Sequence, residues 1–251
     1  MATPPSSYKQ GFFITGTDTG VGKTVITACL LSLFKKHGMD VGVMKPLETG
    51  VDPECSSAAN SDALFLMELA GTGDPLAEVS PFRFKPAASP CQAARLENRS
   101  IEPGKIVRGL RQLADRHELM LVEGIGGLLV PITPTYFVCD LVRDLGLPLL
   151  VVARVTLGTL NHTLLTLRVA IQMGIEVRGV LLNHLEPGEG TGIEKNQGSI
   201  LTEISGIPIV GECPFMGPVS EKNFTPERLN RIEEWLDFDY LMENIVRSKK
   251  E

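Results

Sequence analysis

Residues 16–24, GTDTGVGKT, combine three glycines with a lysine and a threonine at the end. They follow the apolar run GFFIT and precede a segment with helical spacing, so they are expected to form the turn between a strand and a helix. Backbone N–H groups in such a turn can point at phosphate oxygens, with the positive end of the helix dipole behind them. Lys23 would then reach the terminal phosphates, and the hydroxyl of Thr24 would ligate Mg²⁺. This stretch therefore predicts a phosphate-binding loop.

The glycines of this loop have two expected roles. Gly16, Gly20 and Gly22 would let the backbone approach phosphate oxygens closely and would adopt positive φ. The spacing is a variant, because Thr17 stands where the first glycine of such a loop is usual. A plain strand–turn–helix with a lysine at the helix start is the simpler alternative. The preceding strand, the following helix and the three glycines together favour phosphate binding.

A carboxylate at the end of another apolar run would complete the metal side of the site. Glu123 closes LMLVE, and Gly124, Gly126 and Gly127 follow it in what is expected to be a bend with free N–H donors. An acid at a strand end is where nucleotide-binding proteins orient the metal. The alternative is a strand-terminating glutamate in a glycine turn. The phosphate loop favours the site, because it creates the need for such an acid.

Two further residues are weaker candidates on their own. Lys45 ends VGVMK before Pro46, which keeps the chain extended, so the lysine would stand beside the phosphate loop. A solvated lysine at a strand end explains this pattern equally well. Asp62 lies in the first turn of a predicted helix capped by Asn60 or Ser61, where an acid that only complements the helix dipole is the commoner case.

Alternating strands and helices must position these residues. The strand candidates are short apolar runs rich in Val, Ile and Leu, as expected for a parallel sheet covered on both faces. They span residues 11–16, 41–45, 119–124, 148–153, 177–183 and 207–212. Segments with helical spacing span residues 23–38, 60–71, 104–117, 158–174 and 198–206. The pattern predicts a doubly wound α/β fold with its site in loops at the carboxyl ends of the strands.

The connections also carry a local signal. Four glycines are expected to end four of the helices in C-terminal caps. These are Gly38, Gly71, Gly174 and Gly206. The segments 46–60, 83–100 and 184–192 have no clear period and are expected to be irregular loops.

Composition limits the classes of protein to consider. The 251 residues are 43% hydrophobic and 22% charged, as in an ordinary globular protein. Residues 1–10 lack the apolar core of a signal peptide and are expected to be a disordered tail, with 11–251 as a single α/β domain. The net charge of −6 argues against a nucleic-acid or anionic-membrane partner, and no apolar run approaches the ~18 residues of a membrane span. Five dispersed cysteines without a C-x-x-C indicate free thiols in a reducing cytoplasm.

Several motifs together resemble those of the dethiobiotin synthetase family of the biotin pathway, over residues 11–221. They are GTDTGVGKT, KPLETG, NSDA, VEGIGG, GTLNHTLLT and GVLLN, in this order. The resemblance implies a P-loop NTPase-like three-layer fold, with a mostly parallel central sheet and helices on both faces, in a homodimer. It also implies a cyclo-ligase that converts 7,8-diaminononanoate, carbon dioxide and MgATP into dethiobiotin, ADP and phosphate. One substrate amine would form a carbamate, the carbamate would attack the γ-phosphoryl group, and the second amine would close the ring.

The resemblance also assigns roles to residues. It implies that Lys45 lies between carbamate and γ-phosphate, that Lys23 stabilises the transferred phosphoryl group, and that Asn183 reads adenine. The metal side would be Thr24, Asp62 and Glu123. The ATP site would comprise Gly20, Val21, Gly22, Lys23, Thr24, Asp62, Glu123, Gly124, Gly126, Asn183, His184, Pro214, Phe215, Met216 and Glu221. The substrate would meet Thr19 and Thr49 and, with its carboxylate on a helix start of the other subunit, Gly158, Thr159, Leu160 and Asn161.

One departure and two rival classes remain. Many relatives carry glutamate where this chain has Gly20, so any role of that acid is absent or moved. A partitioning-type switch ATPase usually carries an early second lysine, where residues 17–19 read TDT, and often a basic membrane-binding terminal helix. Residues 231–251 are instead rich in acids and are expected to form a helix packed on the body. An amide-forming synthetase usually needs a glutaminase domain, for which no further chain remains.

Overall fold

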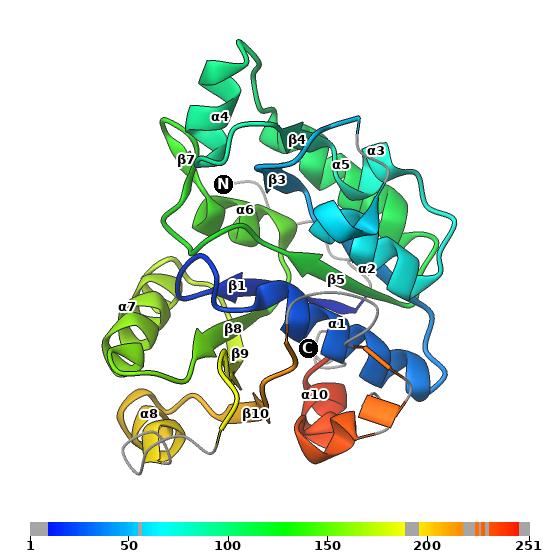
Figure 1. Ribbon diagram of the computed structural model, residues 1–251. Coiled ribbons are helices and arrows are strands. Elements are labelled where there is room, and N and C mark those ends of the chain that lie inside the picture. The colour runs from blue at the N-terminus through cyan, green and yellow to red at the C-terminus, as the bar shows by residue number, and fades with distance from the viewer. Residues whose placement is uncertain are drawn as a thin grey trace, which may run out of the picture.

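The computed structural model describes residues 10–54, 57–188, 196–217, 224–225, 227–228 and 231–245. Its centre is a six-stranded sheet in the order β10-β9-β8-β1-β5-β2, with every neighbouring pair parallel (Figure 1). The strands are β1 Gly11–Gly16, β2 Val41–Met44, β5 Leu119–Glu123, β8 Leu149–Arg154, β9 Val177–Asn183 and β10 Ile209–Cys213. These are the six strands that the apolar runs predict, within two residues at either end.

Helices cover both faces of this sheet. The five predicted helices are α1 Lys23–Lys36, α2 Asp62–Ala70, α5 Pro103–Ala114, α7 Thr159–Gln172 and α8 Gln197–Ser205. The chain moves from β1 to one edge at β2 and then returns across the sheet, so right-handed crossovers place α1 on one face and α5, α7 and α8 on the other. Figure 1 shows α7 and α8 on the opposite side of strands β8–β10 from α1 and α10. The result is the predicted P-loop NTPase-like α/β fold of three layers.

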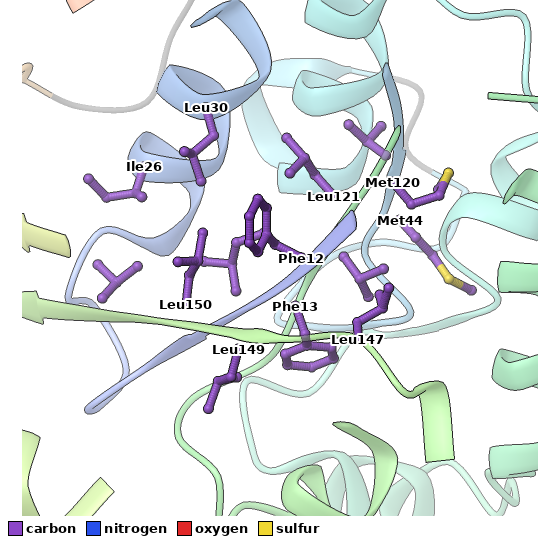
Figure 2. Packing of buried hydrophobic residues seen from close by; sticks show 14 of the residues in the cluster. Phe12, Phe13, Ile26, Leu30, Met44, Met120, Leu121, Leu147, Leu149 and Leu150 are labelled. Atoms are coloured by element: carbon purple, nitrogen blue, oxygen red, sulfur yellow. The ribbon is translucent and has the colours of Figure 1, made fainter. Parts of the chain in front are cut away.

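Adjacent aromatic residues of the central strand join the three layers. Phe12 and Phe13 are fully buried and point to opposite faces of β1 (Figure 2). Phe12 faces α1, where its ring centroid lies 6.5 Å from that of Phe34. Phe13 packs beneath the sheet, close to Leu147 (Figure 2). Because β1 is held from both sides, the loop that follows it starts from a fixed point.

Two of the expected irregular loops contain short elements that the sequence pattern does not reveal. Segment 46–60 holds β3 Leu47–Thr49 and the 3₁₀ helix η1 Ala58–Asn60, and segment 83–100 holds the end of β4 Phe82–Phe84 and α4 Pro90–Leu96. Strands β3 and β4 form a separate parallel pair. The expectation of irregular backbone was therefore wrong for these segments. Residues 184–188 are irregular as expected, and 189–192 lie outside the described residues.

Further short elements lie between the predicted ones. They are α3 Leu76–Val79, the antiparallel strands β6 Pro131–Thr133 and β7 Tyr136–Phe137, α6 Val138–Leu145, the 3₁₀ helix η4 Ile232–Glu234 and α10 Phe238–Ile245. The predicted packing of the terminal segment on the body is confirmed for α10. Its Phe238 stacks on His37 at a centroid distance of 3.6 Å and contacts Phe34.

The glycines expected at the helix C-termini adopt the left-handed conformation of a C-terminal cap. The four capping glycines all have positive φ, between 67° at Gly71 and 79° at Gly38.

Cys29, Cys91, Cys139 and Cys213 are free, and Cys55 lies outside the described residues. Residues 1–9 of the expected tail also lie outside them, and the carbonyl of Gln10 accepts a hydrogen bond from the N–H of Met120. The boundaries of the tail and of the single domain stay predictions. Across the described ranges, no helix has the length and apolarity needed to cross a membrane.

Candidate functional site

The glycine-rich loop lies at the carboxyl end of β1 and leads directly into α1. Gly20 and Gly22 have φ of 75° and 89°, as expected. The expectation of positive φ was wrong for Gly16, which is the last residue of β1. Glycine is needed at position 16 for a steric reason instead. A Cβ there would lie only 2.7 Å from both the carbonyl oxygen of Asp18 and the side chain of Val21. The loop is therefore held tightly against its own backbone.

The turn after β5 borders this loop. The carbonyl of Gly126 accepts a hydrogen bond from the N–H of Gly16 at 3.3 Å, and a Cβ on Gly126 would lie 3.5 Å from Oγ1 of Thr19. The expectation of a free N–H was wrong for Gly124, which donates to the carbonyl of Ile14 at 2.9 Å and so extends the sheet. Glycine is required at 124 because a Cβ would press on the ring of Phe13 at 2.7 Å.

Four candidate residues converge at the start of α1. The ammonium of Lys45 donates to Oε1 of Glu123 and lies 3.1 Å from Oδ2 of Asp62. The hydroxyl of Thr24 donates to the same Oε1 of Glu123 at 2.9 Å. Glu123 is fully buried, whereas the side chain of Asp62 is 42% exposed. Residues from α1, β5, α2 and the end of β2 thus form one cluster at the carboxyl edge of the sheet.

The two lysines of the site have opposite pKa shifts. Burial and the nearby charge of Lys45 lower the pKa of Lys23 to about 8, although Glu123 and Asp62 oppose this shift. Burial would also lower the pKa of Lys45, but the carboxylates of Glu123 and Asp62 outweigh it and raise that pKa above its usual value. Burial opposes ionisation of Asp62, yet its contact with Lys45 keeps its pKa below the ordinary value. Lys45 and Asp62 are therefore ionised at neutral pH.

The oxygen atoms of this cluster suit a hard cation. Thr24, Asp62 and Glu123 supply a hydroxyl and two carboxylates, which are the ligand types that Mg²⁺ prefers. Oε2 of Glu123 is buried and has no hydrogen-bond partner among the described residues. Those residues include no group of three or more His, Cys, Asp or Glu side chains that could form a metal cluster. The two carboxylates and the hydroxyl of this cluster are ligand types that could hold Mg²⁺ together with substrate phosphates.

A pocket of about 270 Å³ opens beside the phosphate loop. Four of the expected ATP-site residues line it, namely Asn183, His184, Phe215 and Met216, together with Val25, Leu185 and Gly217. Pro214 precedes Phe215 but is not among the lining residues, and Glu221 lies outside the described residues. The amide Nδ2 of Asn183 donates to the carbonyl of Val21 at 3.0 Å, and its buried Oδ1 has no partner in the described part of the chain.

The expected substrate residues lie on three elements at the same edge of the sheet. Thr19 is in the phosphate loop, and Thr49 ends β3, the strand that follows Lys45. Gly158 precedes α7 with φ of 92°. Residues 159–161 form the first turn of α7, where Thr159 is buried and Asn161 is exposed. The N–H of Thr159 is already bound to the carbonyl of Thr156 at 3.1 Å, so it is not available to the substrate carboxylate that residues 158–161 are expected to bind.

Sequence reasoning missed a buried ion pair beside the site. Glu48 and Arg83 are both buried, and Arg83 Nε lies 3.3 Å from Glu48 Oε2. Glu48 lies within the motif KPLETG, but a single charged residue in a short segment does not indicate burial. Its partner Arg83 is 35 residues away, so the local sequence could not reveal the pair.

Comparison with known proteins gives relatives along most of the chain. A family model described as an AAA domain matches residues 10–223. The chain is 39% identical to the ATP-dependent dethiobiotin synthetase BioD of Thermodesulfovibrio yellowstonii, over 88% of this chain and 98% of that protein. It is 42% identical to the protein of the same name from Bacillus licheniformis, over 84% and 88% of the two chains.

The fold of the chain is also similar to that of solved structures. The MinD cell division protein of Aquifex aeolicus matches with a TM-score of 0.53, 16% identity and coverage of 95% of this chain and 96% of that one. At this identity the likeness concerns the fold alone.

Proposed function

The chain belongs to the family of ATP-dependent dethiobiotin synthetases, and on this premise we propose how its own residues carry out that reaction. The family activity joins carbon dioxide to the two amines of 7,8-diaminononanoate with consumption of ATP. The convergence of Lys45 with Thr24, Asp62 and Glu123 beside the phosphate loop is the observation that supports this proposal. A cationic group at that position is required where two anions must react.

Lys23 and Lys45 are the proposed catalytic residues. The carbamate oxygen attacks the γ-phosphoryl group and displaces ADP, and because carbamate and phosphate are both negatively charged, the barrier includes their repulsion. Lys45 would stand between them, and Lys23 would neutralise charge on the transferred phosphoryl group. The neighbouring amine then attacks the carbamic–phosphoric anhydride, forms the ring and releases phosphate. The enzyme acts by alignment and charge stabilisation, without a covalent intermediate on the protein.

Thr24, Asp62 and Glu123 would hold Mg²⁺ together with the phosphates, and the bound ion would neutralise charge that develops on their oxygens. The ammonium of Lys45 contacts the carboxylates of Glu123 and Asp62 directly. We therefore propose that Lys45 shares these carboxylates with the cation and turns toward the substrates once the cation is bound.

The pocket at Asn183 is the proposed base site. Because Nδ2 of Asn183 donates to Val21, the oxygen Oδ1 is left as an acceptor beside the pocket. Adenine offers a donor at its 6-amino group, whereas guanine offers an acceptor at the equivalent position. This arrangement favours ATP over GTP. His184, Phe215 and Met216 would enclose the ring.

The remaining proposals concern substrate and assembly. Thr19 and Thr49 would hydrogen-bond the substrate. Residues 158–161, with groups other than the occupied N–H of Thr159, would bind its carboxylate across the interface of a homodimer, at the positive end of α7. We propose a cytoplasmic location, which the free thiols of the described residues support. The rival classes of switch ATPase and amide-forming synthetase are not favoured, because the curated relatives named above are dethiobiotin synthetases.

The test is a direct synthesis. Protein incubated with 7,8-diaminononanoate, bicarbonate and MgATP should yield dethiobiotin by mass spectrometry, in an amount equal to the ADP formed. Reactions that lack either the diamine or ATP are the controls. ADP release without dethiobiotin from folded protein would contradict the proposal and favour a switch ATPase.

A further inference from the structure

A buried ion pair connects the strand after Lys45 to the rest of the site. Glu48 and Arg83 stand opposite each other in the parallel pair β3–β4, whose place beside α2 Figure 1 shows. Their side chains are only 4% and 5% exposed. Removing two charges from water is costly, and a well-packed apolar pair is often at least as stable. The pair therefore needs an explanation other than stability.

The other contacts of the Glu48 carboxylate are with the start of helix α2. Oε2 accepts from the hydroxyl of Ser61 at 2.9 Å, and Oε1 accepts from the N–H of Ala63 at 3.3 Å. Ser61 is the N-cap of α2, because its Oγ accepts from the N–H of Leu64 at 3.3 Å. A carboxylate at this end of a helix satisfies free N–H groups and complements the dipole. Glu48 thus holds the two residues that flank Asp62.

Asp62 depends on this anchorage. Its carboxylate lies 3.1 Å from Lys45 Nζ, but its side chain is 42% exposed, so packing around the carboxylate does little to fix it. The backbone that carries it is fixed through Ser61 and Ala63. Arg83 in turn neutralises Glu48 and donates to the carbonyl of Pro53 at 2.9 Å, which ties the pair to the loop after β3.

We propose that Glu48, neutralised by Arg83, is a positioning residue that holds the N-terminus of α2 so that Asp62 faces the cation site. This inference rests on the proposed function, in which Asp62 is a cation ligand. Glu48 itself would touch neither nucleotide nor substrate. Its effect is exerted on Mg²⁺ through Asp62.

The test uses the double variant Glu48→Met/Arg83→Met, which removes both charges and leaves neither one buried alone. ADP affinity is measured by calorimetry with and without Mg²⁺. We expect unchanged affinity without Mg²⁺ and a loss of about tenfold in the apparent affinity for Mg²⁺, the lower end of the range for partners that orient a metal ligand. The Mg²⁺ concentration for half-maximal synthesis should rise by the same factor.

A double-mutant cycle separates positioning from general damage. Asp62→Asn should lose Mg²⁺ affinity, and adding the Glu48/Arg83 changes should lose little more, because both act through one carboxylate. Arg116→Met is the matched control, since Arg116 pairs with Asp74 at 2.9 Å in a second ion-pair cluster at the amino edge of the sheet. It should lower the melting temperature and leave the Mg²⁺ dependence unchanged.

Wild-type Mg²⁺ dependence in the double variant, or losses that multiply in the cycle, would overturn the proposal. If the double variant does not fold, the same Mg²⁺ measurements are made on Glu48→Gln, which keeps the side-chain volume but removes the negative charge. It should shift the Mg²⁺ dependence in the same direction, and an unchanged dependence would overturn the proposal equally. Calorimetry with ADP needs no synthesis, so failure of the proposed reaction would be seen separately.

Discussion

The side-chain amide of Asn183 donates a hydrogen bond of 3.0 Å to the carbonyl of Val21, and so joins the end of β9 to the phosphate loop. The two residues are 162 positions apart in the sequence. This contact places the proposed base pocket and the phosphate loop at a fixed distance from each other. A nucleotide that binds both would find its two halves already aligned.

Gly22→Ala should break this alignment. A Cβ on Gly22 would overlap Nδ2 of Asn183, and φ there is 89°. We expect ADP affinity to fall by at least about tenfold, which corresponds to about 1.4 kcal/mol. Gly38→Ala is the matched control, because Gly38 has φ of 79° but a Cβ on it would meet no other atom within 4 Å among the described residues. It should cost about 1 kcal/mol of folding stability and leave ADP affinity unchanged. Equal ADP affinities in both variants would contradict a close fit at Gly22.

Lys23 should make nucleotide binding depend on pH. The pKa of its ammonium is about 8, and only the protonated form attracts phosphate. Affinity for ADP should therefore be constant below pH 8 and fall as the pH rises above it, by up to about tenfold per unit. The phosphates of ADP are already fully ionised there, since their last pKa is about 6. Calorimetry at pH 7 to 9.5 measures this, and Lys23→Met should bind weakly without the pH trend. A flat profile for the wild type would contradict the shifted pKa.

The main strands were predictable because burial on both faces leaves a local signal. The four central and edge strands β1, β2, β5 and β8 are apolar along most of their length, and β9 and β10 are mostly apolar but contain Arg178 and Glu212, so the strands can be recognised without knowledge of their neighbours. Strands β3 and β4 left no such signal. Each has three residues, and their central residues Glu48 and Arg83 are charged yet buried. Their burial depends on pairing across 35 residues, which no local pattern contains.

The candidate site likewise has one part that could be predicted from local sequence and one part that could not. The phosphate loop and Glu123 follow from glycines and from the end of an apolar strand, which are local features. The direct contact of Lys45 with Glu123 and Asp62 depends on how β2, β5 and α2 pack, so the local pattern indicated only a lysine beside the loop. The role of the exposed side chains of α7 could likewise not be predicted, because helical periodicity identifies only the residues on the buried face of a helix.

Assembly should be needed for activity. Leu165 of α7 is 57% exposed and lies one turn beyond Asn161 on the same face, beside the proposed shared substrate site. Light scattering at assay concentration should show a dimer, and Leu165→Glu should shift it toward a monomer with reduced synthesis and unchanged ADP affinity. Ile204→Glu is the control, because Ile204 is 59% exposed near the end of α8, toward the amino edge of the sheet. A fully active monomer would contradict a shared substrate site.

Lys45→Gln is the sharpest test of function as opposed to fold. A phosphate loop alone binds nucleotide without a lysine at the end of β2, whereas a reaction between carbamate and phosphate requires a cation between them. Repulsion between unit charges at ~4 Å is about 4 kcal/mol at an effective dielectric near 20, and each ~1.4 kcal/mol is a factor of ten in rate. Turnover should therefore fall by roughly two to three orders of magnitude.

Nucleotide affinity should change much less in Lys45→Gln. The phosphate loop holds the phosphates without Lys45. Loss of the ammonium removes the positive charge that Glu123 and Asp62 share, so Lys45 no longer competes with the cation for these carboxylates. Lys85→Gln is the control, because Lys85 is 64% exposed and its pairing with Asp52 at 3.4 Å is a surface contact of little energetic value. Turnover and ADP affinity are measured on the same preparations. Wild-type turnover in Lys45→Gln would mean that Lys45 only neutralises buried carboxylates, and the chemical step would then need a different cation.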